Sequence, residues 1–156
     1  MKVQICAVGR LRRGAELDLI TDYQTRFDRT GRALGLGPLT ITEVEDRKGG
    51  GPEAEAALLT RSLPKGASLI ALDERGKLLS SPEFAQTLAG LRDQGTQSLA
   101  FLIGGADGLS ADLRASAQLS LSFGKMVWPH MLARVMLAEQ LYRAATILSG
   151  SPYHRS

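Results

Sequence analysis

Five short segments of strand character alternate along this chain with segments of helical character, and few folds are open to a chain with this order. The strand segments are residues 3–8, 39–44, 67–72, 98–103 and 119–122. Each has the length of a strand. Strands that alternate with helices predict a parallel sheet with helices on both faces, so the expected fold class is α/β.

Helices are expected between and after these strands, at residues 15–33, 52–63, 81–93, 110–117 and 129–149. Ser81 and Ser110 are the expected N-caps, and Pro129 opens the last helix. Gly150 suits the position that follows a helix. Residues 73–76, Asp-Glu-Arg-Gly, are expected to form a turn after the third strand.

Composition narrows the class of protein further. The chain has 156 residues, of which 44% are hydrophobic, which is enough for a core without disulfides or metal. No linker or repeat divides residues 1–156, which predicts a single domain.

Cys6 is the only cysteine, so no intrachain disulfide can form. With two histidines and one cysteine a usual structural zinc site is excluded, although carboxylates can hold other metals; we expect no metal. No apolar run is long enough for a membrane span or a signal peptide, so we expect a cytoplasmic protein without a membrane partner.

Basic charge gathers towards the two ends of the chain. Residues 1–32 hold seven Lys/Arg against four Asp/Glu, and residues 123–156 hold four against one. The segment between them is acidic, with eight against eleven. A polyanionic partner would explain this distribution, and ordinary surface charge is the alternative. The densest basic cluster consists of Arg10, Arg12 and Arg13.

The last expected helix is apolar around most of its circumference, from Met131 to Leu148. Such a helix must be covered on nearly all sides. A second subunit could cover one side, or the helix could be buried within its own subunit. Glu139 and Arg143 have the spacing of an i,i+4 ion pair.

A glycine-rich loop follows the fourth expected strand, at residues 104–108 with the sequence Gly-Gly-Ala-Asp-Gly. Ligands bind at the carboxyl ends of parallel strands, and glycine lets the backbone approach a ligand closely. The spacing is neither a dinucleotide fingerprint nor a phosphate loop, and a structural turn is the alternative.

An apolar connector at residues 121–130 joins the fifth strand to the last helix and carries the only tryptophan, Trp128. Apolar side chains beside a glycine could form the walls of an adenine-sized pocket, with backbone groups to read the base edge. Packing into the core is the alternative interpretation.

The tail at residues 151–156 brings a tyrosine, a histidine and an arginine together as Tyr153, His154 and Arg155. Chain ends are commonly frayed. This cluster nevertheless offers stacking, a titratable ring and a phosphate contact.

These motifs, in this order and spacing, resemble the ribosomal large subunit pseudouridine N3-methyltransferase family, a minimal group of the knotted α/β (SPOUT) methyltransferases. The resemblance spans the whole chain. It is carried by Val3–Gly9, Leu72-Asp73, Gly76-Lys77, Leu102-Ile103-Gly104-Gly105, Gly108-Leu109-Ser110, Leu121-Ser122, Pro129-His130, Arg134, the run from Glu139 to Ala144, and Pro152-Tyr153-His154-Arg155.

The resemblance implies a C-terminal trefoil knot, a homodimer, and S-adenosylmethionine bound in the knot as methyl donor. The implied substrate is N3 of a pseudouridine in 23S ribosomal RNA, which we expect to be recognised in the assembled ribosome. The donor-binding residues implied by motif match are Leu72, Gly104, Phe123, Gly124, Lys125, Met126, Val127 and Trp128.

Methylation at N3 requires loss of a proton and leaves negative charge on the flanking carbonyl oxygens. Arg143 or Arg155 is expected to stabilise that charge. His154 is the expected proton acceptor because imidazole titrates near neutral pH, with Asp107 as the alternative. The tail of one subunit is expected to complete the site of the other.

The residues expected to contact RNA are Arg10, Arg12, Arg13, Tyr153 and Arg155. The chain departs from the family pattern at residues 47–51, where glycines leave only Arg47 and Lys48 as phosphate contacts. Two alternative functions stay open: methylation of another RNA such as tRNA, and a non-catalytic ribosome-associated module that binds nucleotides.

Overall fold

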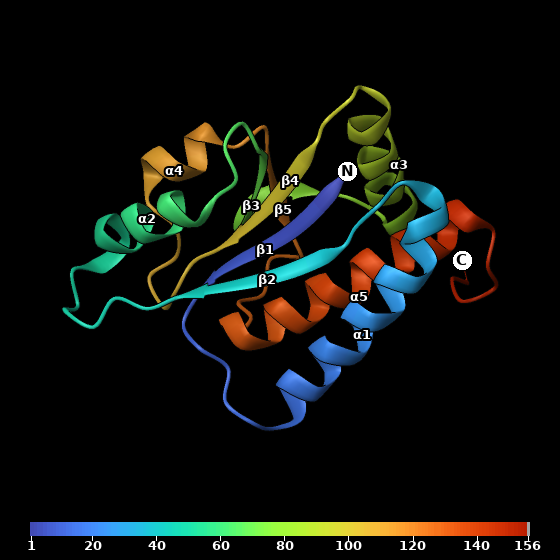
Figure 1. The fold of residues 1–156 in the computed structure, drawn as a ribbon. Helices are drawn as coiled ribbons and strands as arrows, with labels where there is room; N and C mark the ends of the chain where they lie inside the picture. The colour runs from blue at the N-terminus through green and yellow to red at the C-terminus, as the bar shows by residue number, and fades with distance from the viewer. Residues whose placement is uncertain (156) are drawn as a thin grey trace.

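A single parallel sheet contains all five expected strands. The computed structural model describes residues 1–155, and Ser156, the last residue of the tail, lies outside them. The sheet order is β2-β1-β4-β3-β5, and all four strand pairs are parallel. The strands are β1 (Lys2–Val8), β2 (Leu39–Val44), β3 (Ser68–Leu78), β4 (Ser98–Ile103) and β5 (Leu119–Ser122). The expected α/β fold class is confirmed (Figure 1).

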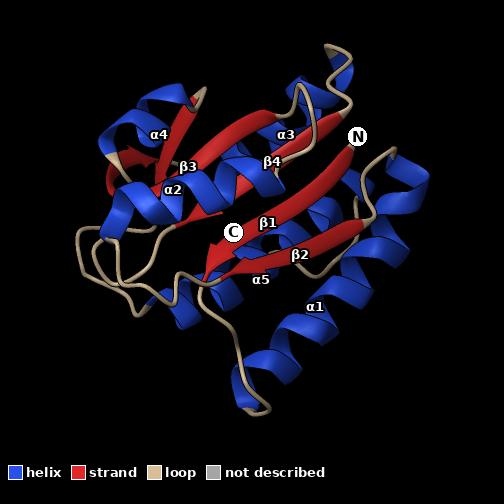
Figure 2. Cartoon of the chain, turned by 60° about the vertical axis from the view of Figure 1, so that its left-hand side comes forward, coloured by secondary structure: helices blue, strands red, loops and turns tan. Residues whose placement is uncertain are grey.

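Helices cover both faces of this sheet (Figures 1 and 2). They are α1 (Ala15–Gly31) with the 3-10 turn η1 (Arg32–Leu34), α2 (Gly51–Ser62), α3 (Ser81–Asp93), α4 (Ala111–Ser116) and α5 (His130–Ser149). On one face α5 packs between α1 and α3, and α2 and α4 lie on the other. None of the helices in residues 1–155 has the length and apolar character of a membrane span.

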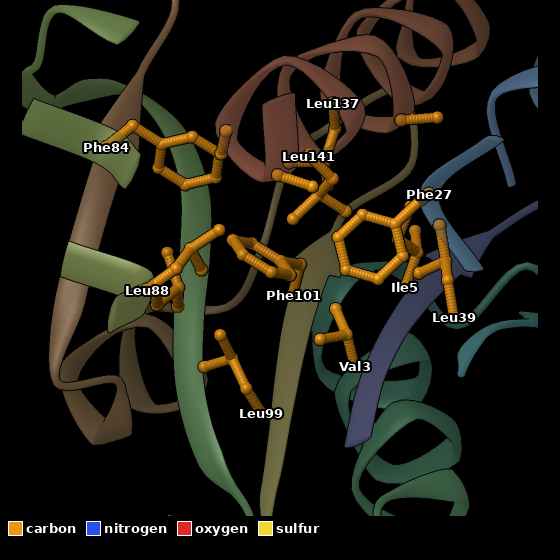
Figure 3. Close-up of a cluster of buried hydrophobic side chains, with 14 of the residues drawn as sticks. Val3, Ile5, Phe27, Leu39, Phe84, Leu88, Leu99, Phe101, Leu137 and Leu141 are labelled. Atoms are coloured by element: carbon orange, nitrogen blue, oxygen red, sulfur yellow. The ribbon is translucent and has the colours of Figure 1, made fainter. Parts of the chain in front are cut away.

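Alternation along the strands supplies both halves of the core. Val3, Ile5 and Ala7 of β1 face the α1/α3/α5 layer, whereas Cys6 and Val8 face the α2/α4 layer. Figure 3 shows the larger cluster, in which Phe101 of β4 lies among side chains from both strands and helices. The rings of Phe101 and Phe84 meet edge to face with centroids 6.0 Å apart. The central strand β4 is almost wholly buried, which explains its unbroken apolar sequence.

The N-cap of α3 is Ser80, so the expectation of Ser81 was wrong by one residue. The Ser80 hydroxyl accepts from the Glu83 N–H, and the Glu83 carboxylate accepts from the Ser80 N–H. A capping box needs its glutamate three residues after the cap, which selects Ser80. Ser81 instead donates to Gln140 Oε1 at 2.7 Å. The expected cap Ser110 is confirmed, as is Gly150, which follows α5 with a φ of 74°.

The turn expected at residues 73–76 is also wrong, because β3 continues to Leu78. Leu72 and Lys77 both pair with Leu121 of β5, so residues 73–76 form a bulge within the strand. Gly76 passes close to β5: a Cβ there would lie 2.6 Å from the Ser120 carbonyl. Polar residues and a glycine indicated a turn, but pairing with a distant strand keeps the chain extended. We call residues 73–76 the β3 bulge.

Helix α5 is covered by its own subunit along most of its length. Val135, Leu137 and Leu141 are buried against the sheet and the neighbouring helices. Met131 and Leu132 in its first turn are 40% and 43% exposed. The Glu139–Arg143 ion pair is confirmed, with Arg143 Nη2 2.6 Å from Glu139 Oε1.

Candidate functional site

A cavity of about 330 Å³ opens at the carboxyl ends of β4 and β5 and at the β3 bulge beside them. Three separated segments line it: residues 72–75, residues 103–108, and a discontinuous set between residues 121 and 133. We call it the strand-end cavity. Of the expected donor-binding residues all but Lys125 line it, and so does Asp107. The structure thus brings together the glycine loop and the apolar connector, which sequence reasoning had placed at strand ends.

The glycine loop after β4 leaves little room for a side chain at its first two residues, Gly104 and Gly105. A Cβ on Gly104 would lie 2.7 Å from the Gly108 carbonyl oxygen, and one on Gly105 would lie 2.9 Å from Glu55 Oε2. Gly105 and Gly108 form an antiparallel bridge, and Gly108 has a φ of +77°. Main-chain atoms therefore form this wall of the cavity, as a close-fitting ligand site requires.

The connector forms an exposed apolar wall of the cavity and is linked by a hydrogen-bonded serine to the β3 bulge. Met126, Val127 and Trp128 are 74%, 80% and 42% exposed. The buried Ser122 hydroxyl accepts from the Gly124 N–H at 3.0 Å and lies within 3.1 Å of the Glu74 carbonyl oxygen. This hydroxyl joins the connector to the β3 bulge, so the two walls are held together.

Asp73 holds the β3 bulge in shape. Its carboxylate accepts from the Arg75 N–H at 2.8 Å and from Arg75 Nε and Nη2 at 3.0 Å each. Arg114 Nη1 lies 3.4 Å away. The hydrogen bond from the Arg75 side chain lowers the pKa of Asp73 below its ordinary value, against the opposing effect of burial. Asp73 was not expected from the sequence to be part of the site, and the Asp-x-Arg spacing is its only local signal.

His130, at the start of α5, also lines the cavity and was not assigned a role from the sequence. Its Nδ1 is buried and has no hydrogen-bond partner within residues 1–155. Burial lowers the pKa of His130, and the nearby Arg134 adds to the effect. Within the same described range, no three or more His, Cys, Asp or Glu side chains gather as a metal site.

The tail folds back on α5 as far as His154. The Tyr153 hydroxyl donates to Glu139 Oε1 at 3.0 Å, and its ring lies 4.7 Å from that of Tyr142. The Arg143 guanidinium sits 4.9 Å above the Tyr153 ring and contacts His154 Nδ1 at 3.3 Å. Burial, then the bond to Glu139, raises the pKa of Tyr153 to about 12. We call these four side chains, Glu139, Arg143, Tyr153 and His154, the tail cluster.

The tail cluster and the strand-end cavity are separate within one chain. No tail-cluster residue lines the cavity, whereas Asp107 does. In Figure 1, α5 begins near the strand ends and runs to the C-terminus at the far side. His130 and Arg143 are separated by roughly 20 Å of helix rise. The expected catalytic residues therefore fall into two groups.

A second hollow, of about 470 Å³, lies beside the first. We call it the apolar groove. Its walls come from α1, the end of β3, α3 and α5, and Leu19 and Leu78 in it are 44% and 59% exposed. Leu121, Phe123 and Gly124 line both hollows, and Glu139 of the tail cluster borders the groove.

The expected RNA-contacting arginines are exposed. Arg12 and Arg13 lie free on the loop between β1 and α1, and Arg155 is exposed in the tail. Arg10 is 3.6 Å from the exposed Glu45. Tyr153, in contrast, is occupied by its contacts with Tyr142 and Arg143.

Comparison with known proteins agrees with this arrangement. Residues 1–154 match the family model described as "Predicted SPOUT methyltransferase". The chain is 70% identical over 155 residues to the ribosomal RNA large subunit methyltransferase H of Dinoroseobacter shibae, and the match covers 99% of each chain. The protein of the same name from Ruegeria pomeroyi is also 70% identical, with the same coverage.

Among solved structures, a probable methylase family protein from Haemophilus influenzae has a TM-score of 0.50 and 12% identity, over 99% of this chain and 70% of that one. At that identity the likeness concerns the fold. The family model and the full-length relatives together show that the chain belongs to the SPOUT methyltransferase family.

Proposed function

We propose that this protein transfers a methyl group from S-adenosylmethionine to N3 of a pseudouridine in 23S ribosomal RNA. One observation carries the proposal: three segments far apart in the sequence, each implied by the family resemblance to bind the donor, line one cavity at the strand ends. The full-length relatives named ribosomal RNA large subunit methyltransferase H support the RNA substrate. Such a substrate belongs to the cytoplasm.

The strand-end cavity suits the donor in size and chemistry. Its volume of about 330 Å³ lies within the usual range for small-molecule sites. Met126, Val127 and Trp128 offer apolar surface for the adenine ring, and the three glycines of the glycine loop offer bare backbone. When bound there, S-adenosylmethionine supplies an electrophilic methyl group. The task of Leu72, Gly104 and the connector is to hold it in line with the accepting nitrogen.

A homodimer would bring the two groups of catalytic residues together. Asp107 lies at the cavity while Arg143 and His154 lie at the tail cluster, so we propose that the partner subunit's tail completes each site. The apolar groove beside the tail cluster is surface that a second copy would cover. We also expect the C-terminal trefoil knot of the family, with its crossing where the β3 bulge meets β5 and the connector.

His154 and Asp107 are the two candidates for the group that accepts the N3 proton. A guanidinium has donors only, so the contact from Arg143 makes His154 Nδ1 an acceptor and leaves the ring proton on Nε2. In this arrangement His154 and Arg143 both offer N–H groups, suited to the carbonyl oxygens that gain charge. Asp107 is exposed and keeps free carboxylate oxygens. We therefore propose Asp107 as the acceptor, with His154, expected from the sequence to take the proton, as the alternative.

RNA binding is assigned to the exposed arginines. Arg10, Arg12 and Arg13 form one phosphate-binding loop, and Arg155 adds a contact in the tail. We propose that Tyr153 orients the tail, since its ring is already packed. A chain of 156 residues leaves little surface for an independent RNA-binding unit, so we propose the assembled ribosome as the substrate.

The experiment that tests the function is transfer of labelled methyl from S-adenosylmethionine to ribosomes from a strain that lacks this gene. Mass spectrometry then locates the modified nucleotide. One new methyl on a 23S pseudouridine is the expected result. Methylation of tRNA would redirect the proposal to another RNA. Donor binding without transfer to ribosomes, free ribosomal RNA or tRNA would indicate a non-catalytic module.

A further inference from the structure

A fully buried arginine at the start of α5 is not used by the chemistry described above. The side chain of Arg134 has no exposed surface. Its Nη1 donates to Glu43 Oε2 at 2.8 Å, and its Nη2 donates to the carbonyl oxygens of Val8 and Gly9 at 3.2 Å each. All of these partners lie at the carboxyl ends of β1 and β2, where the loop at residues 9–14 begins. We call this loop, which carries Arg10, Arg12 and Arg13, the arginine loop.

The carboxylate of Glu43 extends this contact into the loop. The same Oε2 atom accepts from the backbone N–H of Leu11 at 2.6 Å. Leu11 lies between Arg10 and Arg12, the residues proposed to bind phosphate. One oxygen atom therefore connects α5 to the backbone of the arginine loop.

The first turn of α5, which precedes Arg134, reaches the strand-end cavity. His130, one turn before Arg134 on α5, lines that cavity. Its ring lies against the start of the arginine loop, since a Cβ on Gly9 would be 3.3 Å from His130 Cε1. Gly9 has a φ of +95°, a conformation that glycine tolerates. The first turn of α5 thus contacts both the cavity and the loop.

Stability alone does not account for this ion pair, in which Arg134 is fully buried and Glu43 is partly buried. Removing an arginine from water is costly, and apolar residues can replace a buried ion pair without loss of stability. Here Nη1 donates to Glu43 and Nη2 to the carbonyls of Val8 and Gly9, which fixes the path of the backbone there, whereas the buried Nε has no hydrogen-bond partner within residues 1–155.

We infer that Arg134 and Glu43 form a positioning pair that holds the arginine loop in the orientation that binds ribosomal RNA, in register with the donor cavity. The inference rests on the proposed function and adds to it a cause for the loop's conformation. The pair acts through the backbone of Gly9 and Leu11 and touches neither donor nor RNA.

The test is Glu43→Gln, with Glu45→Gln as the matched control. Both variants remove one negative charge near the loop, but Glu45 is exposed and pairs only with surface arginines. If charge alone mattered, both variants would bind ribosomes more tightly. The positioning role predicts that Glu43→Gln raises the KM for ribosomes roughly tenfold, as expected for loss of oriented phosphate contacts. The Kd for S-adenosylmethionine and kcat should change less than about twofold.

Two further measurements make the test independent of methyl transfer. Hydrogen exchange at Leu11 should accelerate in Glu43→Gln and stay unchanged in Glu45→Gln. Binding of ribosomes in the absence of donor should weaken in parallel. Arg134→Lys, which keeps the charge but loses the fork to Val8 and Gly9, should show an intermediate effect and serves if Glu43→Gln does not fold.

Equal behaviour of the Glu43 and Glu45 variants would overturn the inference, as would an equal loss of donor and ribosome affinity. Failure of the unaltered protein to methylate any RNA would instead refute the proposed function. Ribosome binding and Leu11 exchange would still decide the role of the pair in that case.

Discussion

At the scale of single residues, several side chains at the site act by holding backbone. Asp73 binds three donors of Arg75 and shapes the β3 bulge, and the Ser122 hydroxyl joins that bulge to the connector. Neither residue type suggests this role from sequence. The partner of Ser122 becomes visible only when the chain is folded, because the Ser122–Glu74 contact spans 48 residues, whereas Asp73 and Arg75 are only two residues apart.

Replacing Asp73 by Asn should lower the free energy of unfolding by about 1–3 kcal/mol at pH 7, through loss of charge-assisted hydrogen bonds. The pKa of Asp73 is depressed in the folded state, so its stabilising effect is complete above the ordinary carboxyl value of about 3.9. It disappears as pH falls through the lower folded value. Urea melts of the two proteins should therefore differ at pH 7 and converge as the pH falls through the lowered pKa of Asp73.

Asp93→Asn is the control for this prediction. Asp93 pairs with Arg92 at 2.9 Å but is 67% exposed, so its loss should cost less than about 0.5 kcal/mol. A gap between wild type and Asp73→Asn that persists at low pH would contradict the assigned cause.

Substitution of each candidate proton acceptor tests whether that residue takes part in the chemistry. Asp107→Asn should lower kcat by about 100-fold or more if Asp107 accepts the N3 proton. His154→Ala should also lower turnover, because Nε2–H and the orientation of Arg143 are lost. Donor binding, measured by calorimetry, should be unchanged in both. Unchanged turnover in either variant would remove that residue from the chemistry.

At the scale of elements, the glycine loop after β4 is the most constrained segment. Gly104→Ala should reduce the affinity for S-adenosylmethionine more than tenfold, because a Cβ 2.7 Å from the Gly108 carbonyl oxygen must displace the loop. Gly90→Ala is a matched control in α3, where a Cβ would meet nothing within 4 Å. That change should raise stability by roughly 0.5–1 kcal/mol and leave donor affinity intact. Calorimetric titration and thermal melts of both variants check the pair, and normal donor affinity in Gly104→Ala would exclude the loop from the site.

The strands were predictable because their signal is local. Strands β2, β4 and β5 begin and end where they were expected. The buried β4 is almost wholly apolar, whereas β2 and β5 alternate apolar with polar residues, and both patterns are typical of strands. The β3 bulge was not predictable, because its course depends on pairing with Leu121 some forty residues later. The capping error at Ser80 arose from two adjacent serines, which only the position of Glu83 distinguishes.

Some parts of the candidate site were likewise predictable from the sequence and others were not. The glycine loop and connector were found because glycines and apolar residues at strand ends are visible in sequence. The pair of Arg134 and Glu43 was not, because its members lie 91 residues apart and each is a common residue type. The roles given to the donor-binding, catalytic and RNA-binding residues stay predictions.

At the scale of the whole molecule, the separation of the tail cluster from the strand-end cavity makes the proposed site depend on two chains. A pocket from one subunit would work with a tail from the other. The strand-end cavity, the apolar groove and the tail cluster each contain only some of the groups that the proposed reaction uses.

Mixed dimers of Gly104→Ala and His154→Ala chains test this dependence. Each variant alone is expected to be nearly inactive. In a mixed dimer one of the two sites combines an unaltered pocket with an unaltered tail, so random mixing should restore about a quarter of wild-type methyl transfer. Activity no greater than that of the two variants alone would show that each chain uses its own tail. Sedimentation of the mixture establishes that dimers are present.

The burial of Cys6 in the middle of β1 has a practical consequence. Its side chain has no exposed surface, and burial raises the pKa of the thiol to about 11. Since alkylating reagents attack the thiolate, the folded chain should resist maleimide at neutral pH. Any labelling then reports the opening of the central sheet. Because Cys6 is the only cysteine in the sequence, the rate of maleimide labelling, followed by mass spectrometry, measures unfolding at a single site without an engineered cysteine.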